Sequence, residues 1–200
     1  GTTYLTLSTL NAEDDAVNMT GINGGWAGNR TPDHYVQTYF APESADFTTG
    51  EYKIADKRAY FHIKGRTQSM EATFDAEGKE INNLNTFLCG WSCIKFNNVP
   101  HDMDAVDYAA TAATKNFSDI DWPLIRLGEI HLIYAEACMH AGGDASAQVA
   151  ALAERAGVAA PAAINADFLM AERARELMWE AHRRTDLIRY GKWISGYNWT

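Results

Sequence analysis

The sequence has little of several features that specialised proteins need, and each shortage excludes a class. Its three cysteines are too few for a disulfide-rich scaffold. The CGWSC stretch (89–93) has neither a second cysteine pair nor the nearby histidines that a zinc site requires. No apolar run approaches the roughly eighteen residues of a membrane-spanning helix. We therefore expect Cys89 and Cys93 to be small buried thiols, although a disulfide between them stays possible at this point.

Positive charge is also scarce. Seventeen basic residues face twenty-six acidic ones, and the formal net charge is −9. The basic residues are scattered except for one cluster between Arg173 and Lys192, where carboxylates accompany them. Nucleic acid is therefore not expected as a partner. The sequence also lacks a phosphate-binding loop, a G-x-S-x-G motif and a dinucleotide fingerprint, so we expect no cofactor.

What is present is a globular composition that changes character near residue 120. With 46% apolar residues, the 200-residue chain can bury a core and is expected to form one domain or two small ones. Residues 1–120 contain short β-compatible runs, such as TYLTLSTL and RAYFHI, separated by turn residues. A short helix is expected at 32–40, with Thr31 as its N-cap.

Residues 121–200 have the periodicity of helices. Apolar residues recur every three or four positions through 124–140, and Gly142 ends the pattern. A second helix is expected over 145–155, and a third from Asn165, with the pattern resuming up to Gly191. The expected fold is therefore mainly α, with long loops and a few short β-strands.

Two long motifs resemble a known family. DWPLIRLGEIHLIYAEA (121–137), followed by ERARELMWEAHRRTDLIRYGKW (172–193), is similar to the C-terminal signature of the SusD/RagB family of surface glycan-binding lipoproteins. DKRAYF (56–61) and CIKFNN (93–98) resemble two further strands of that family. The sequence departs from the family at Ala181, where a glycine is usual, and in LAERAGVAA (152–160), which keeps only part of a family segment.

The resemblance implies both a fold and a function. The fold would be a fragment of a SusD-like, tetratricopeptide-related helical scaffold that lacks the family's N-terminal helices. The function would be non-catalytic glycan binding and delivery to a SusC-like TonB-dependent outer-membrane transporter. The full-length protein would lie on the cell surface at the outer membrane, held by a lipid anchor outside this chain. A structural or adhesive surface protein, or an enzyme that degrades polysaccharides, is the alternative.

The charged C-terminal segment favours a structural role over catalysis. Glu176 and Glu180 lie four residues apart on one helix, where nearby arginines would lower their pKa, whereas a glycosidase needs one carboxyl with a raised pKa. Arginine pairs with carboxylates through its planar fork. We therefore expect an ion-pair network between this segment and the helix at 124–140. Its expected members are Arg126, Glu129, Glu136, Glu172, Arg173, Glu176, Glu180, Arg184, Asp186 and Arg189.

Two loops could bind a sugar, because aromatic rings stack on sugar faces while polar side chains bracket the hydroxyls. NGGWAGNR (23–30) places Trp26 between glycines, with Asn23, Asn29 and Arg30 around it, although a buried tryptophan in a packed turn is an equal alternative. NNLNTFLCGW (82–91) is the second choice, and there a core role for Trp91 is favoured. No metal is expected at HDMDAVD (101–107), which lacks the glycine and glutamate of a calcium-binding EF-hand loop.

Overall fold

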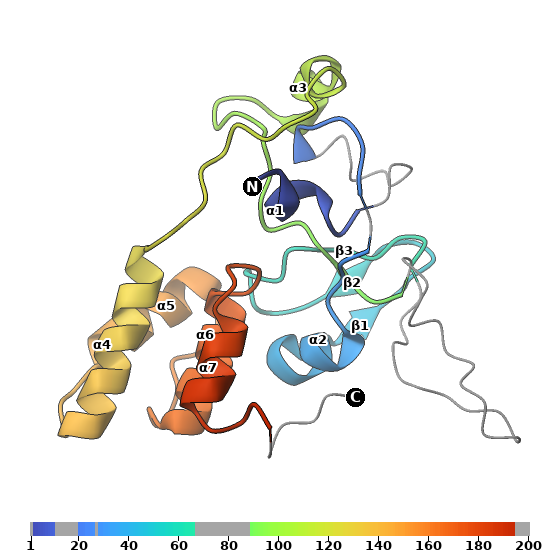
Figure 1. Cartoon of the computed structure of the whole chain (residues 1–200). Coiled ribbons are helices and arrows are strands. Elements are labelled where there is room, and N and C mark those ends of the chain that lie inside the picture. Colours follow the sequence, from blue (N-terminus) through green and yellow to red (C-terminus); the bar gives the residue numbers. More distant parts are fainter. Residues whose placement is uncertain (1, 11–19, 27, 67–88, 195–200) are drawn as a thin grey trace, which may run out of the picture.

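The computed structural model describes residues 2–10, 20–26, 28–66 and 89–194, and within them the fold is mainly helical. Figure 1 shows the helices that follow residue 120 gathered on one side of the chain, with the short strands and the remaining helices on the other. The mainly α prediction is confirmed. The elements are α1 (Thr3–Leu7), α2 (Asp33–Phe40), β1 (Ser44–Ala45), β2 (Tyr52–Lys53), β3 (Phe61–His62), β4 (Ser92–Cys93), α3 (Ala105–Ala112), α4 (Leu127–Ala141), α5 (Ser146–Ala156), α6 (Ala166–Glu176) and α7 (Arg183–Arg189).

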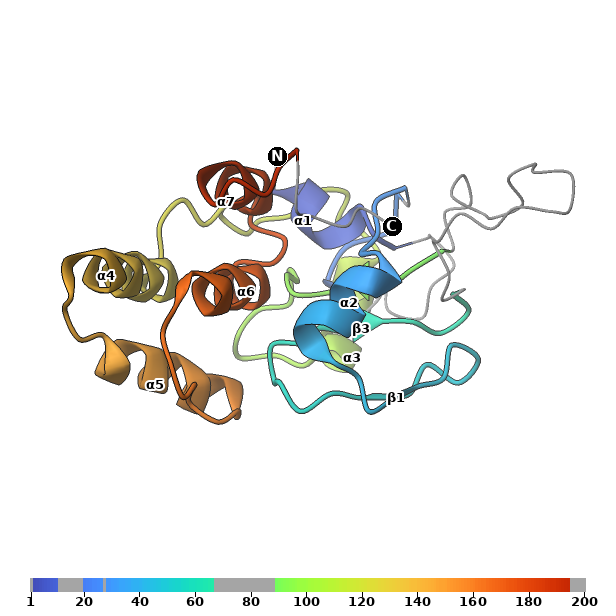
Figure 2. The same ribbon diagram turned by 90° about the horizontal axis from the view of Figure 1, so that it is seen from below.

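The C-terminal helices form one packed group. Helix α4 contacts both α5 and α6, and α6 also contacts α7 and α2 (Figure 2). Gly142 and Gly157 end α4 and α5 with φ angles of 72° and 70°, as expected for helices that stop at a left-handed glycine. Asn165 caps α6, because its side-chain oxygen accepts the Phe168 N–H at 2.9 Å. The apolar interior comprises Leu132, Ala135, Ala145, Val149, Leu152 and Leu169.

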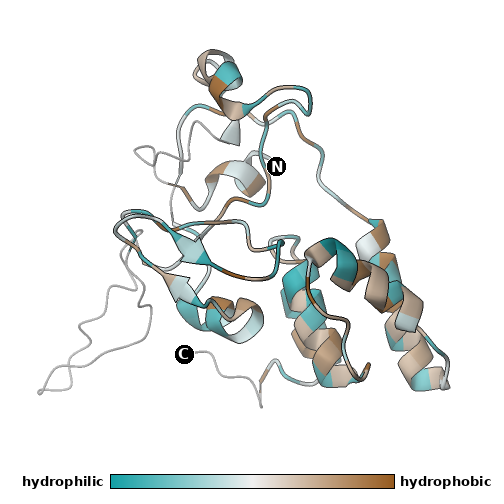
Figure 3. Ribbon diagram, turned by 180° about the vertical axis from the view of Figure 1, so that it is seen from behind, coloured by the Kyte–Doolittle hydropathy of each residue, from teal (hydrophilic) through white to brown (hydrophobic). Residues whose placement is uncertain are grey.

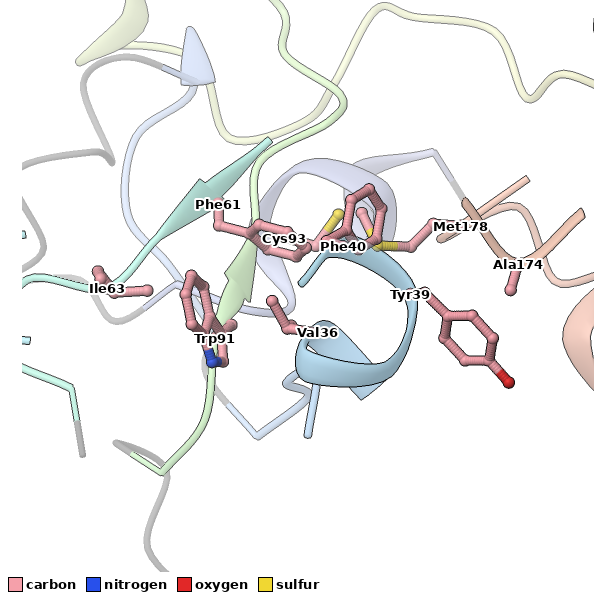
Figure 4. Close-up of a cluster of buried hydrophobic side chains, with 9 residues drawn as sticks. All are labelled: Val36, Tyr39, Phe40, Phe61, Ile63, Trp91, Cys93, Ala174 and Met178. Carbon is pink, nitrogen blue, oxygen red and sulfur yellow. The ribbon is translucent and has the colours of Figure 1, made fainter. Parts of the chain in front are cut away.

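A second core joins the N-terminal half to α6. Strands β1 and β2 pair antiparallel through Ser44↔Lys53 and Ala45↔Tyr52, and β3 and β4 through Phe61↔Cys93 and His62↔Ser92. The side chains around these strands meet those of α2 (Figure 4). Because Ala174 and Met178 belong to the same cluster, the two halves of the chain share this core. Its buried members are Val36, Tyr39, Phe40, Phe61, Ile63, Trp91, Cys93, Ala174 and Met178. The cysteines of CGWSC are both buried thiols that are not joined in a disulfide.

Two sequence expectations for the N-terminal half are wrong. The run TYLTLSTL reads as a strand, but residues 3–7 form helix α1. Leu5 and Leu7 are both about 1% exposed, so burial by the surrounding chain overrides the strand preference of this short run. Thr31 is not the N-cap of α2, since its backbone pairs with Trp91, donating at 2.8 Å and accepting at 2.9 Å. Helix α2 begins one residue after Pro32 instead.

The chain breaks between α6 and α7 at two residues with left-handed backbones. Trp179 has a φ of 68° and Ala181 a φ of 65°, a region that costs non-glycine residues about 1–2 kcal/mol. The indole N–H of Trp179 donates to the Leu5 carbonyl at 3.1 Å, and its ring stacks on Tyr4. These contacts hold the break in place. Ala181 lies at the position where the family usually has glycine, which is the residue that this backbone favours.

One face of α4 carries exposed apolar side chains. Leu127 is 70% exposed, and Ile130, Ile133 and Tyr134 are between 45% and 49% exposed. Figure 3 shows apolar residues mixed with polar ones along the C-terminal helices. Within the described residues, no helix combines the length and the apolar character needed to cross a membrane.

Candidate functional site

The loop around Trp26 presents its side chains to solvent. Trp26 is 55% exposed, Asn23 and Asn29 are exposed, and Arg30 is half-buried. The open alternative of a buried tryptophan therefore does not hold in this structure. The glycines suit the loop, since Gly24 and Gly28 have φ angles of 83° and 94°.

Backbone hydrogen bonds anchor this loop at three points. The Trp26 N–H donates to the Leu7 carbonyl at 3.1 Å, and the Asn29 N–H to the Ser8 carbonyl at 3.0 Å. The Asn23 N–H donates to the Lys115 carbonyl at 2.8 Å. The loop thus carries an exposed indole ring and two exposed amides on a backbone that is held in place.

Phe117 is an exposed aromatic residue that the sequence reasoning missed. It is 73% exposed and lies two positions after Lys115, whose carbonyl accepts the Asn23 N–H. The loop of Phe117 therefore touches the loop of Trp26. Its only signal in the sequence is an aromatic residue inside the polar stretch KNFSD.

Trp91 is a core residue, which corrects its inclusion among the ligand-binding candidates. Its side chain is fully buried, and its ring packs edge-on against Phe47 and Tyr52. It also packs edge-on against Phe61 (Figure 4). Its indole N–H donates to Asp33 Oδ1 at 2.8 Å. A tryptophan with its ring covered and its N–H satisfied presents nothing to a sugar. Residues 82–88 of the same candidate stretch lie outside the described residues.

The predicted ion pairs centre on Glu176 and Glu180, which are 2% and 4% exposed. Arg126 reaches both: its Nη1 lies 2.6 Å from Glu176 Oε1, and its Nε lies 2.7 Å from Glu180 Oε2. Lys95 also pairs with Glu180, and Arg155 with Glu176. Burial alone would raise the pKa of each carboxyl, but hydrogen bonds from Arg126 and the neighbouring cations outweigh it and lower the pKa of both.

Arg58 extends this network into the N-terminal half. It lies 2.6 Å from Asp56, 2.6 Å from Glu172 and 3.0 Å from Glu176. Arg175 lies 2.7 Å from Glu172. The sequence reasoning did not name the partners Asp56, Arg58, Lys95, Arg155 and Arg175. The motifs DKRAYF and CIKFNN, which contain three of them, were the available signal.

The remaining network members join α4, α6 and α7. Arg173 Nε lies 2.8 Å from Asp186 Oδ1, and Arg189 Nη2 lies 2.9 Å from Glu136 Oε2. Glu129 lies 3.6 Å from His182 Nδ1.

Arg184 does not join this network, which corrects the expectation. Its guanidinium lies over the Trp193 ring, 5.4 Å from the ring centroid. The neighbouring Arg183 turns inward instead and contacts Tyr39 and the Met170 carbonyl. The reason is the break at residues 177–182, which resets the helical register between Glu180 and α7.

The acidic loop 101–107 has a structural role. Asp104 caps α3, because its Oδ1 accepts the Asp107 N–H at 2.8 Å. Among the described residues, no group of three or more His, Cys, Asp or Glu side chains is placed to hold a metal ion.

Comparison with known proteins identifies the class to which this arrangement belongs. The SusD family matches residues 2–200, and the chain belongs to this family. It is 34% identical over 118 residues to the starch-binding protein SusD of Bacteroides thetaiotaomicron. The aligned part is 58% of this chain and 20% of that relative. The match therefore spans a minor part of the relative's length.

Proposed function

We propose that the chain belongs to a non-catalytic protein that binds a glycan, and that the Trp26 loop makes the contact within these residues. We further propose that the full-length protein delivers the glycan to a SusC-like TonB-dependent transporter. It would lie at the cell surface on the outer membrane, held by a lipid anchor outside this chain. The observation that carries the proposal is the exposed indole ring of Trp26 on an anchored loop.

The chemistry of the loop suits a sugar. An aromatic ring offers a large apolar face at little entropic cost, and the face of a sugar ring is lined with C–H groups that pack on it. The exposed amides of Asn23 and Asn29 provide both donors and acceptors, which match the hydroxyl groups of a sugar. Phe117 is a candidate second ring on the neighbouring loop. Family membership and the relative named as a starch-binding protein support the same ligand class.

The carboxylates argue against hydrolysis as the function. Glu176 and Glu180 are buried, and their cationic partners lower the pKa of both. A glycoside hydrolase needs a protonated carboxyl facing a second one across the scissile bond. Two ionised, buried and fully paired carboxylates cannot serve as that acid.

Replacement of Trp26 by alanine tests the proposal. By analogy with base stacking on aromatic residues, we expect a loss of about 1–3 kcal/mol in binding free energy. Calorimetry against starch-derived and other oligosaccharides would measure it, with circular dichroism as the folding control. Tyr60→Ala is the matched control, since Tyr60 is 49% exposed but lies outside this loop. Equal affinity of the Trp26→Ala variant and the parent chain would place the contact elsewhere.

Two further measurements separate the alternatives. Release of reducing ends from polysaccharides by the purified chain would favour a degrading enzyme. Failure of the chain to bind any glycan on an array would favour a structural or adhesive surface protein.

A further inference from the structure

A small cavity lies where α6, the break and the start of α7 meet. Its volume is about 210 Å³, which corresponds to about seven water molecules at their volume in the liquid. Its basic lining consists of Arg173, His182 and Arg183, and its apolar wall includes Trp179 and Ala181. Tyr35 adds a second aromatic ring. Among the described residues that line it, none is acidic.

One guanidinium nitrogen of Arg173, which lines both this cavity and a neighbouring cleft, lacks an acceptor in the described part of the chain. The Arg173 side chain is only 5% exposed, and its Nε donates to Asp186. Its buried Nη1 has no hydrogen-bond partner in the described part of the chain. Buried charged donors are nearly always satisfied in native proteins, so an acceptor from outside the chain would complete the hydrogen bonding of this side chain.

The charges around the cavity favour an anion. Asp186 lies behind Arg173, but it is shared with Arg189, which lies 3.3 Å from the same Oδ1 atom. Arg183 adds a second guanidinium, and its contacts include the Tyr39 hydroxyl, the Tyr39 ring and the Met170 carbonyl. Glu129 lies beside His182, the third basic group.

A neighbouring cleft provides a contrast. It has a volume of about 440 Å³, and it shares Arg173 and His182 with the cavity. Three carboxylates line it, those of Glu129, Glu136 and Asp186. Arg189 and His140 line the cleft as well, so its basic groups face carboxylates, whereas no acidic side chain lines the smaller cavity among the described residues.

We propose that the cavity beside Arg173 and Arg183 binds a carboxylate or sulfate group. Arginine suits both, because its planar fork donates two parallel hydrogen bonds to oxygens of such groups. This step rests on the proposed function: if the protein binds a glycan, this site implies that the glycan is acidic and carries a uronic acid or a sulfate ester. A free inorganic anion is the other source of the same chemistry.

Titration of the folded chain with sodium sulfate, sodium glucuronate and glucose, at constant ionic strength, tests the site. We expect sulfate and glucuronate to bind and glucose to have no effect at this site. Sulfate binding without glucuronate binding would assign the cavity to a free inorganic anion. Absence of binding by both anions would overturn the proposal.

Two adjacent arginines of α7 supply a matched pair of variants. Arg183→Met removes a charge that lines the cavity, and we expect it to weaken sulfate binding by about tenfold or more, the range of a charge-assisted hydrogen bond. Arg184→Met removes a charge from the next position, over Trp193, and we expect the dissociation constant to stay within about twofold. Equal weakening by both variants would show general charge screening and would refute a defined site.

A measurement on the unmodified chain covers the case in which Arg183→Met does not fold. With ¹⁵N-labelled arginine, sulfate should shift the side-chain resonances of Arg173 and Arg183 but leave those of Arg184 unchanged. Uniform shifts of all three would refute the site. The two proposals can fail separately. Trp26→Ala should leave sulfate binding unchanged. If a neutral glycan binds through Trp26 but sulfate does not bind, only the proposal of an anion site is refuted.

Discussion

Removal of the Glu180 carboxylate should destabilise the folded chain. Glu180 is 4% exposed, and it accepts from Arg126 at 2.7 and 2.8 Å and also from Lys95. In the Glu180→Ala variant, both cations would remain in a largely buried setting without that carboxylate. Removal of one partner of a buried ion pair costs about 3–5 kcal/mol, so we expect a loss of that size. Domains are typically stable by about 5–15 kcal/mol, so the variant would lose a large share of its free energy of unfolding.

Urea unfolding followed by circular dichroism would measure this loss. Glu43→Ala is the matched control, because Glu43 pairs with Lys53 at the surface, where the two side chains are 54% and 70% exposed. An exposed pair contributes at most about 1 kcal/mol. If both variants unfold at the same urea concentration, the buried network does not stabilise the fold in the way argued above. A normal fold with lost glycan binding would instead make Glu180 a ligand residue.

Two further predictions concern the backbone and pH. Ala181→Gly should raise the free energy of unfolding by about 0.5–1 kcal/mol, since glycine tolerates the φ of 65°. The control Ala151→Gly, on the exposed face within α5, should lower the free energy of unfolding by about 1 kcal/mol. Thermal unfolding would measure both, and melting temperatures that shift in the same direction in the two variants would refute the argument. Acid should destabilise the chain, because the folded pKa of Glu176 and Glu180 is lowered: their contribution is present above the unfolded pKa of about 4.3 and is lost as pH falls through the folded pKa. Urea midpoints between pH 7 and 2 would show it, and the acid slope should be shallower in Glu180→Ala.

The sequence was most informative where structure is local. The helices α4, α5 and α6 follow from apolar periodicity and from glycine or asparagine at their ends, which are interactions between near neighbours. Helix α1 could not be predicted in this way, because its β-compatible residues become helical only within the packed core. The fold class was therefore accessible from the sequence, whereas this short element depended on the rest of the chain.

In the candidate sites, too, local features could be predicted from the sequence and long-range contacts could not. The charge pattern indicated that Glu176 and Glu180 are structural, but it could not identify Arg58 or Lys95 as partners, since more than eighty positions separate each from the carboxylate it meets. Arg184 was misplaced because the sequence does not reveal the break at residues 177–182, which changes the helical register before α7. Exposure of Trp26 is likewise a property of the packed loop that no spacing in the sequence reveals.

The position of α6 in the chain has a consequence for biosynthesis. Glu176 in this helix and Glu180 in the break after it pair with Arg58, Lys95 and Arg126, which lie 50 to 118 positions earlier in the chain. As the chain leaves the ribosome, Lys95 and Arg126 therefore emerge long before Glu180, and contacts of such separation close slowly. A chain that stopped before residue 172 would lack the carboxylates that pair with Lys95 and Arg126, so we expect it to be less stable than the whole chain.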